Sequence, residues 1–219
     1  MQQHLPERGV NNWDSLRLIA AVWVIFIHSF YFSGNPIPFF KHTEGIIRLG
    51  QIGVYIFFTI SGYLISKSWI RNPDVVNYFR NRILRIFPGL IVCVLLTAFI
   101  VGPVFTSLSV TDYFRSGDTY RYLWNISLWK TVFTLPGVFQ GHDVNAPLWT
   151  LFFEFMMYIS VAVLGLTGLL SKKNTFIFTV LFIVLSFASI LLLPYSIVFL
   201  KINISNLVIF GAYFYGGVL

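Results

Sequence analysis

The fold is decided first by the stretch Ser15–Phe32, SLRLIAAVWVIFIHSFYF, an apolar run that carries one arginine and one histidine. Arg17 and His28 are eleven residues apart. A helix over this stretch would place both side chains on one face, about 16 Å apart along its axis. Ionisable residues at membrane depth are costly and usually mark a functional site. The stretch therefore predicts a membrane helix with one functional face.

The composition assigns the whole chain to the integral membrane proteins. Of its 219 residues, 57% are hydrophobic and only 11% are charged, against about 45–50% and about 25% in ordinary globular domains. The net charge of +7 does not indicate a nucleic-acid partner, because the basic residues cluster between apolar runs and form no continuous basic face. We expect no metal site, since Cys93 is the only cysteine and His4, His42 and His142 lack metal-ligand spacing.

The chain is predicted to be an all-α bundle of transmembrane helices, with six spans in a single domain over residues 1–219. Most expected spans are close to the ~20 residues that a bilayer crossing needs, and they cover roughly residues 15–33, 46–66, 84–107, 146–170, 175–194 and 203–219.

The basic residues between the spans predict the orientation. Basic loops stay on the cytoplasmic side of a membrane. The segment after the second span holds Lys67, Arg71, Arg80, Arg82 and Arg85, and the segment after the fourth holds Lys172 and Lys173. Both segments and the N-terminus are therefore expected in the cytoplasm, which leaves residues 34–45, 109–145 and 195–202 outside.

This topology gives a depth to the base and the carboxylate inside the spans. His28 is expected about 8 Å below the outer surface of the membrane. Asn145 is a plausible N-cap of the fourth span, which places Glu154 about 10–13 Å below the same surface. The two side chains therefore come out at similar depth in the outer half of the membrane.

Each ionisable group also has a plain structural interpretation. Arg82 and Arg85, three residues apart and so facing nearly the same way, can be ordinary positive-inside residues, and His28 can be a hydrogen-bonded core residue. Glu154 needs a stronger reason, because an isolated carboxylate in an apolar helix must be paired, protonated or in contact with water. The consistent depths of these groups, with Arg17, Arg82 and Arg85 together at the inner face, favour a functional site.

Four segments carry motifs in a set order along the chain. They are Trp13–Arg17 continuing to His28 as Arg-x10-His, GVYIFFTISGYLI at Gly53–Ile65, RILRIFP at Arg82–Pro88, and PLWTLFFE at Pro147–Glu154 followed by Tyr158. In this order they resemble the integral-membrane acyltransferase-3 family, which includes O-antigen and exopolysaccharide O-acetyltransferases. Members of that family have about ten spans, so we expect this chain to be a C-terminally truncated member. Phe155 stands where many members carry a second carboxylate, which puts a mechanism with paired acids in doubt.

The resemblance implies a membrane O-acyltransferase of the inner (plasma) membrane. Such an enzyme would move an acyl group, first of all acetyl, from acyl-coenzyme A on the cytoplasmic side to a hydroxyl of an extracytoplasmic glycan or glycolipid. Acetyl-coenzyme A is then a co-substrate, and no cofactor is expected to stay bound. The expected partners are acyl-coenzyme A, the glycan or glycolipid acceptor and the lipid bilayer.

The same resemblance is consistent with definite roles for the ionisable residues. Arg17, Arg82 and Arg85 would bind the phosphates of the donor by charge and bidentate geometry. His28 would deprotonate the acceptor hydroxyl or carry the acyl group itself. Glu154 would hold the imidazole tautomer and stabilise the imidazolium.

Other interpretations stay open. Ser61, Gly62 and Trp149 are candidates for an acyl channel, but the Ser61-Gly62 pair can equally serve close helix packing. The acyl group could be succinyl, or the acceptor a small molecule such as a macrolide. A protein of a different class, a proton-coupled transporter, would use His28 and Glu154 as a proton relay. The two halves of the chain show no convincing repeat that would support a transporter.

Overall fold

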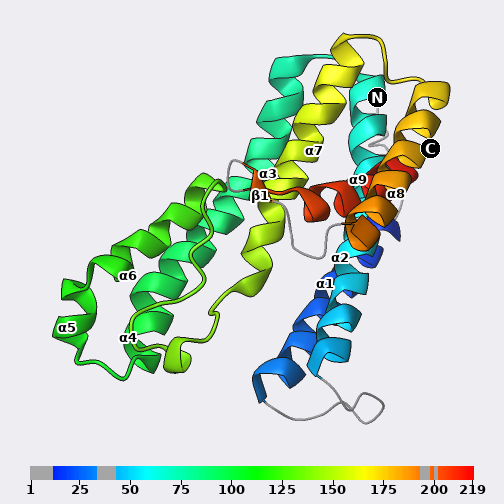
Figure 1. Cartoon of the computed structure of the whole chain (residues 1–219). Coiled ribbons are helices and arrows are strands. Elements are labelled where there is room, and N and C mark those ends of the chain that lie inside the picture. Colours follow the sequence, from blue (N-terminus) through cyan, green and yellow to red (C-terminus); the bar gives the residue numbers. More distant parts are fainter. Residues whose placement is uncertain (1–11, 34–42, 193–197, 200–201) are drawn as a thin grey trace. The chain divides into compact units, whose positions relative to one another are not determined.

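The computed structural model describes residues 12–33, 43–192, 198–199 and 202–219, and these are helical almost throughout (Figure 1). The described strands are only β1 (Val198–Phe199) and β2 (Ile202–Asn203), which pair antiparallel with Val198 opposite Asn203. The prediction of an all-α protein is confirmed.

The chain divides into two compact units, and the division falls inside a helix. The first unit combines Met1–Lys67 with Thr167–Leu219, and the second is Ser68–Leu166. Each unit is described by itself below, and the prediction of one domain over the whole chain stays a prediction.

The first unit contains α1 (Asn12–Ser33), most of α2 (Thr43–Arg71), α8 (Lys172–Leu192) and α9 (Ile204–Val218). α1 and α2 lie side by side (Figure 1), joined by a 2.8 Å hydrogen bond from Trp23 Nε1 to the carbonyl of Leu49. α2 and α9 approach so closely that a methyl group at Gly62 would collide with the carbonyl of Phe214. Small residues thus bring these two backbones together, as is common between membrane helices.

The second unit is built on α3 (Val75–Leu96), which continues through the π-helical segment η1 (Thr97–Val101) into α4 (Gly102–Phe105). α3 begins at Val75, well before the expected residue 84, because the Asp74 side chain caps it by accepting from Asn77 N–H at 2.7 Å. The arginines that lowered the hydropathy here do not break a helix. One face of α3 is buried at intervals of four residues: Tyr78, Arg82, Ile86, Leu90 and Val94.

The other long helix of the second unit is α7 (Trp149–Leu166), which follows the 3-10 turn η4 (Ala146–Leu148) and lies beside α3 (Figure 1). A 3.0 Å hydrogen bond from Tyr78 Oη to the carbonyl of Tyr158 joins the two helices. Asn145 stands at the N-cap position of η4, as expected, but its side chain makes no capping hydrogen bond. It donates instead to Thr97 Oγ1 at 2.8 Å and Tyr122 Oη at 3.0 Å, because these buried hydroxyls lie within its reach.

Short helices fill the chain between α4 and α7: α5 (Val110–Arg115), α6 (Gly117–Arg121), η2 (Tyr122–Ser127) and η3 (Phe139–Gly141). Buried polar side chains hold this segment in place. Asn125 donates to the carbonyls of Tyr122 and Val132 and accepts from Val132 N–H, at 2.8–2.9 Å. Tyr113 Oη donates at 2.7 Å to the carbonyl of Ala98 in the π-helical segment.

Among the described residues, four helices are long and apolar enough to cross a membrane: Leu49–Arg71, Val75–Phe105, Ala146–Leu166 and Lys172–Ser189. Shorter apolar helices cover Ser15–Phe30 and Ile204–Val218. Each of the six predicted spans therefore contains an apolar helix, and the chain is a multi-pass membrane protein.

Candidate active site

The carboxylate of Glu154 is buried in the second unit, with only 3% of the residue exposed. Tyr158 lies one helical turn further along α7, on the same face, and its hydroxyl donates a hydrogen bond to Glu154 Oε1. A buried carboxylate needs such donors, because it has lost its hydration. Glu154 is therefore a supported acid group inside an apolar helix.

Arg82 is buried in the same unit, whereas Arg85 is exposed. Arg82 Nη2 donates to Ser68 Oγ at 2.7 Å, and its guanidinium carbon lies 5.3 Å from the ring centroid of Tyr78. Arg82 and Arg85 are three residues apart on α3, as expected, but they differ in burial. Arg82 lies on the buried stripe of α3, and Arg85, three residues further, is rotated away from it.

Arg82, Tyr158 and Glu154 form one cluster, which we call the Glu154 cluster. The guanidinium carbon of Arg82 lies 5.7 Å from the ring centroid of Tyr158, whose hydroxyl donates to Glu154 Oε1. The depths expected from the sequence place Arg82 at the inner face of the membrane and Glu154 in its outer half. Sequence reasoning had given Tyr158 no role, although its spacing of four residues from Glu154 was a signal that could have found it.

His28 lies in the first unit, half-buried on α1 against α2. Its Nδ1 is 2.8 Å from the carbonyl oxygen of Val24. A carbonyl can only accept, so this hydrogen bond places the proton on Nδ1 and leaves Nε2 as the basic nitrogen of a neutral imidazole. Gly50 of α2 lies against the ring, since a Cβ there would be 3.4 Å from His28 Cε1.

Arg17 is buried on the same helix as His28. Its Nη2 donates to Ser61 Oγ at 3.3 Å, and its guanidinium carbon lies 5.6 Å from the ring centroid of Phe57. Ser61 is fully buried, and Gly62 is enclosed against Phe214. These contacts are those of helix packing, so an acyl channel at Ser61 and Gly62 stays a prediction.

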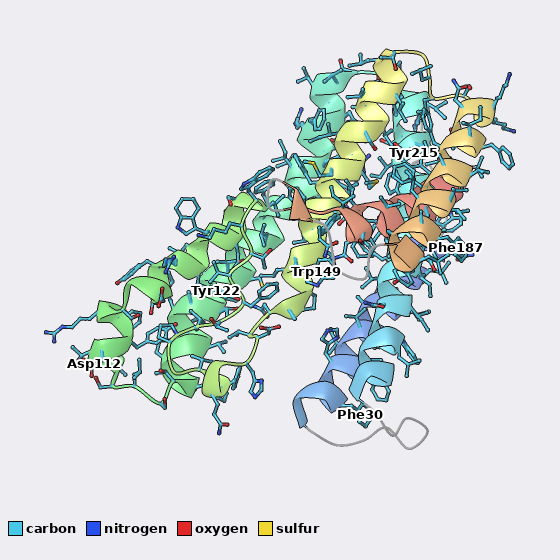
Figure 2. The ribbon with its side chains drawn as sticks, viewed as in Figure 1. Phe30, Asp112, Tyr122, Trp149, Phe187 and Tyr215 are labelled. Carbon is cyan, nitrogen blue, oxygen red and sulfur yellow. The ribbon has the colours of Figure 1, made fainter. Side chains whose placement is uncertain are left out.

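The candidate residues thus fall into two groups. Arg17, His28, Ser61 and Gly62 belong to the first unit, and Arg82, Arg85, Glu154 and Trp149 to the second. Trp149 stands half-buried at the start of α7, with its ring 5.6 Å from that of Phe153 (Figure 2). The predicted contact between His28 and Glu154 stays a prediction, because the two residues lie in different units.

Sequence reasoning missed a second polar cluster, formed by Asn145, Thr97 and Tyr122 in the second unit. Tyr122 is fully buried (labelled in Figure 2), and burial raises its pKa to about 12. Asn145 Nδ2 donates to the hydroxyls of Thr97 and Tyr122 and lies 3.7 Å from Cys93 Sγ. The residue spacing carries no signal for this cluster, because its members come from three distant parts of the chain.

Comparison with known proteins identifies the family. Residues 10–219 match the family model described as an acyltransferase domain. The chain belongs to the acyltransferase-3 family. It is 35% identical to an O-acetyl transferase of Shigella phage Sf6 over 179 residues, which is 80% of this chain and 52% of that protein.

More distant relatives match the same region. Nodulation protein 10 of Rhizobium leguminosarum is 31% identical over 70% of this chain and 44% of its own length. The peptidoglycan O-acetyltransferase OatA of Listeria monocytogenes is 28% identical over 67% of this chain and 22% of its own length. The chain therefore spans about half, or less, of these relatives. No solved structure matches it.

Proposed function

We propose that this chain belongs to a membrane O-acyltransferase that moves an acyl group, first of all acetyl, from acyl-coenzyme A to a hydroxyl of an extracytoplasmic glycan or glycolipid. The observation that carries the proposal is a buried, hydrogen-bonded carboxylate, Glu154, in a chain whose residues 10–219 match an acyltransferase domain. Two relatives with O-acetyl transferase in their names support an acetyl group and a hydroxyl acceptor.

The chemistry assigned to His28 is proton transfer at Nε2. The acceptor hydroxyl oxygen attacks the thioester carbonyl while Nε2 takes the hydroxyl proton. An ester C–O bond forms, the C–S bond breaks, and the proton passes to the departing thiolate of coenzyme A. In the alternative route, Nε2 attacks the thioester carbonyl, and the C–S bond breaks to release the thiolate of coenzyme A. The acceptor hydroxyl then attacks the acyl group, the C–N bond breaks, and the hydroxyl proton passes to the thiolate. The Val24 carbonyl supports both routes, because it holds the proton on Nδ1.

Glu154 is proposed to stabilise the imidazolium that forms when His28 takes the proton. A buried carboxylate is suited to this role, because its charge acts strongly in a medium of low dielectric. The role requires the side chains of His28 and Glu154 to meet in the working enzyme, so replacing either of them should impair acyl transfer.

The donor site is proposed to use arginines for the phosphates of coenzyme A: the sequence suggests Arg17, Arg82 and Arg85, and of these we propose Arg17 and Arg85. Arg85 has the most suitable surroundings, because its side chain is exposed on α3 and free to form bidentate contacts. The donor is expected on the cytoplasmic side of the plasma membrane, where the basic loops are predicted to lie.

The test is the transfer of labelled acetyl from acetyl-coenzyme A to cell-envelope glycan, in membranes that contain the full-length gene product. Wild type, His28→Ala and Glu154→Gln are compared at equal protein levels. Label that appears with wild type, is lost in His28→Ala and is strongly reduced but still measurable in Glu154→Gln supports the proposal.

Two other results would contradict it. Equal label in wild type and His28→Ala would keep the enzyme but return His28 to a structural role. No label with wild type, combined with proton-coupled flux of a solute that depends on His28, would replace the enzyme by a transporter.

A further inference from the structure

We propose that Tyr158 and Arg82 are positioning residues for the carboxylate of Glu154, an inference that rests on the proposed function. Tyr158 holds the carboxylate in one rotamer through its hydroxyl, and Arg82 holds the ring of Tyr158. In this arrangement Arg82 acts through Tyr158 and Glu154 and does not bind phosphate.

A hydrogen bond within α7 holds the carboxylate of Glu154. Tyr158 is fully buried, and its hydroxyl is a donor to Glu154 Oε1. The i, i+4 spacing on α7 lets the two side chains meet without strain. A hydrogen bond to a charged group is among the strong ones, and it fixes the orientation of that group as well as stabilising it.

Tyr158 is itself held in place by α3. Its backbone carbonyl accepts from Tyr78 Oη at 3.0 Å, so α3 holds this turn of α7 in place. Tyr78 is 2% exposed, which keeps water away from the contact. The phenol of Tyr158 therefore has a defined position from which to aim at Glu154.

Arg82 lies against the rings of two tyrosines. Its guanidinium lies over the rings of both Tyr78 and Tyr158, at 5.3 Å and 5.7 Å from their centroids. Ser68 Oγ accepts from Nη2 at 2.7 Å, which anchors the group on its other side. A cation held over two aromatic faces stabilises their positions.

The surroundings of Arg82 argue against phosphate as its ligand. The residue is 7% exposed, and Nε is buried with no hydrogen-bond partner in the described part of the chain. A phosphate would have to enter this enclosed space beside the buried carboxylate of Glu154, which repels it. Arg85, exposed on the same helix, has no such restriction.

The two roles predict different kinetics for acyl transfer by the full-length protein in membranes. Tyr158→Phe removes one oxygen and keeps the ring, so we expect kcat to fall by about tenfold to a hundredfold, the range of one hydrogen bond to a charge. The KM for acetyl-coenzyme A should stay within about twofold of wild type. Tyr120→Phe, an exposed tyrosine of α6, is the matched control and should behave like wild type.

Arg82→Gln should also lower kcat with little change in the KM for acetyl-coenzyme A, whereas Arg85→Gln should raise that KM. A raised KM in Arg82→Gln, with kcat unchanged, would overturn the inference and restore the phosphate role. If Arg82→Gln fails to accumulate in the membrane, Ser68→Ala provides the second test. It removes the acceptor of Nη2 and should lower kcat in the same direction.

A double-mutant cycle separates positioning from general structural damage. Tyr158→Phe should lower kcat in wild type but have no further effect in a Glu154→Gln background, because both changes break the same interaction. Independent, multiplicative effects would overturn the inference. An active wild type with an unaffected Tyr158→Phe would overturn it while leaving the proposed function intact. An inactive wild type would instead remove the function on which the inference rests.

Discussion

At the scale of single residues, His28 depends on a glycine of the neighbouring helix. A Cβ at Gly50 would lie 3.4 Å from both His28 Cε1 and Ile27 Cγ2, so a methyl group just fits and a longer side chain does not. The imidazole is held on its other side by the Val24 carbonyl. The position of Nε2 therefore depends on the size of residue 50.

We predict that Gly50→Ala keeps most of the transferase activity and that Gly50→Leu lowers it by roughly 100-fold, because misplacing a reacting group by about 1 Å can cost that much. Labelled acetyl transfer at equal protein levels is the measurement. Gly89→Leu is the control, since nothing lies within 4 Å of a Cβ at that position on α3. Equal loss in both leucine variants would show that the effect does not come from His28.

Tyr122 lies outside the membrane-spanning helices and makes the stability of its polar cluster depend on pH. Its pKa is raised from 10.0 to about 12, chiefly because burial disfavours the phenolate. The unfolded chain loses this proton near pH 10, so the contribution of Tyr122 to stability is complete below pH 10. It is lost as the pH rises from 10 through 12.

We predict that Tyr122→Phe loses less thermal stability than wild type between pH 10 and 12. Tyrosinate absorbance should show the cause directly: the difference between the titrations of wild type and Tyr122→Phe should have its midpoint near 12, as for a group with that pKa. A midpoint near 10 would mean that Tyr122 reaches water in the folded protein.

At the scale of elements, the packing of α2 against α9 rests on two glycines. Gly62 of α2 lies against the carbonyl of Phe214, and Gly217 of α9 lies against the carbonyl of Thr59. Neither carbonyl can move without disturbing its helix. Gly216, next to Gly217 in sequence, has nothing within 4 Å of a Cβ. Gly217 and Gly216 are therefore a matched pair for substitution, because only Gly217 is in close contact with α2.

We predict that Gly217→Ala destabilises the protein by about 1–3 kcal/mol, the range for overpacking. Gly216→Ala should be neutral or stabilising by up to about 1 kcal/mol, because alanine favours a helix over glycine. Thermal denaturation of the two variants in the same detergent checks the difference. If both melt together, α2 and α9 are not in close contact in the membrane.

At the scale of the whole molecule, the distribution of basic residues predicts the topology. Lys172 and Lys173 are expected in the cytoplasm, and the segment that contains α6 is expected outside. Asp118 on α6 and Lys172 are both exposed, so each can be replaced by a reactive cysteine. Cys93 is the only cysteine of this 219-residue chain and has to be removed.

We predict that, in a Cys93→Ser background, Asp118→Cys reacts with a membrane-impermeant maleimide in intact spheroplasts. Lys172→Cys should react only after lysis, because residue 172 is expected to face the cytoplasm. The opposite pattern would reverse the orientation and with it the side from which acyl-coenzyme A enters. Labelling after lysis in both variants is the control for reactive thiols.

The candidate site shows where sequence reasoning was sufficient and where it was not. His28 and Glu154 were found from their cost inside apolar segments, and the motifs around them indicated the family. The burial of Arg82 was not found, because hydropathy placed the start of α3 after it and the Asp74 cap lies outside the apolar run. The use of Asn145 was also missed, since its partners Thr97 and Tyr122 are far away in sequence.

The sequence by itself determined that this protein is a set of apolar helices, because a chain in lipid must satisfy its backbone hydrogen bonds locally, as helices do. It also determined which residues carry costly charge, since that depends only on residue type and apolar context. The tertiary structure alone decided which arginine is buried, that Tyr158 holds Glu154, and which glycines allow α2 and α9 to touch. These depend on contacts between distant segments, which a local pattern does not contain.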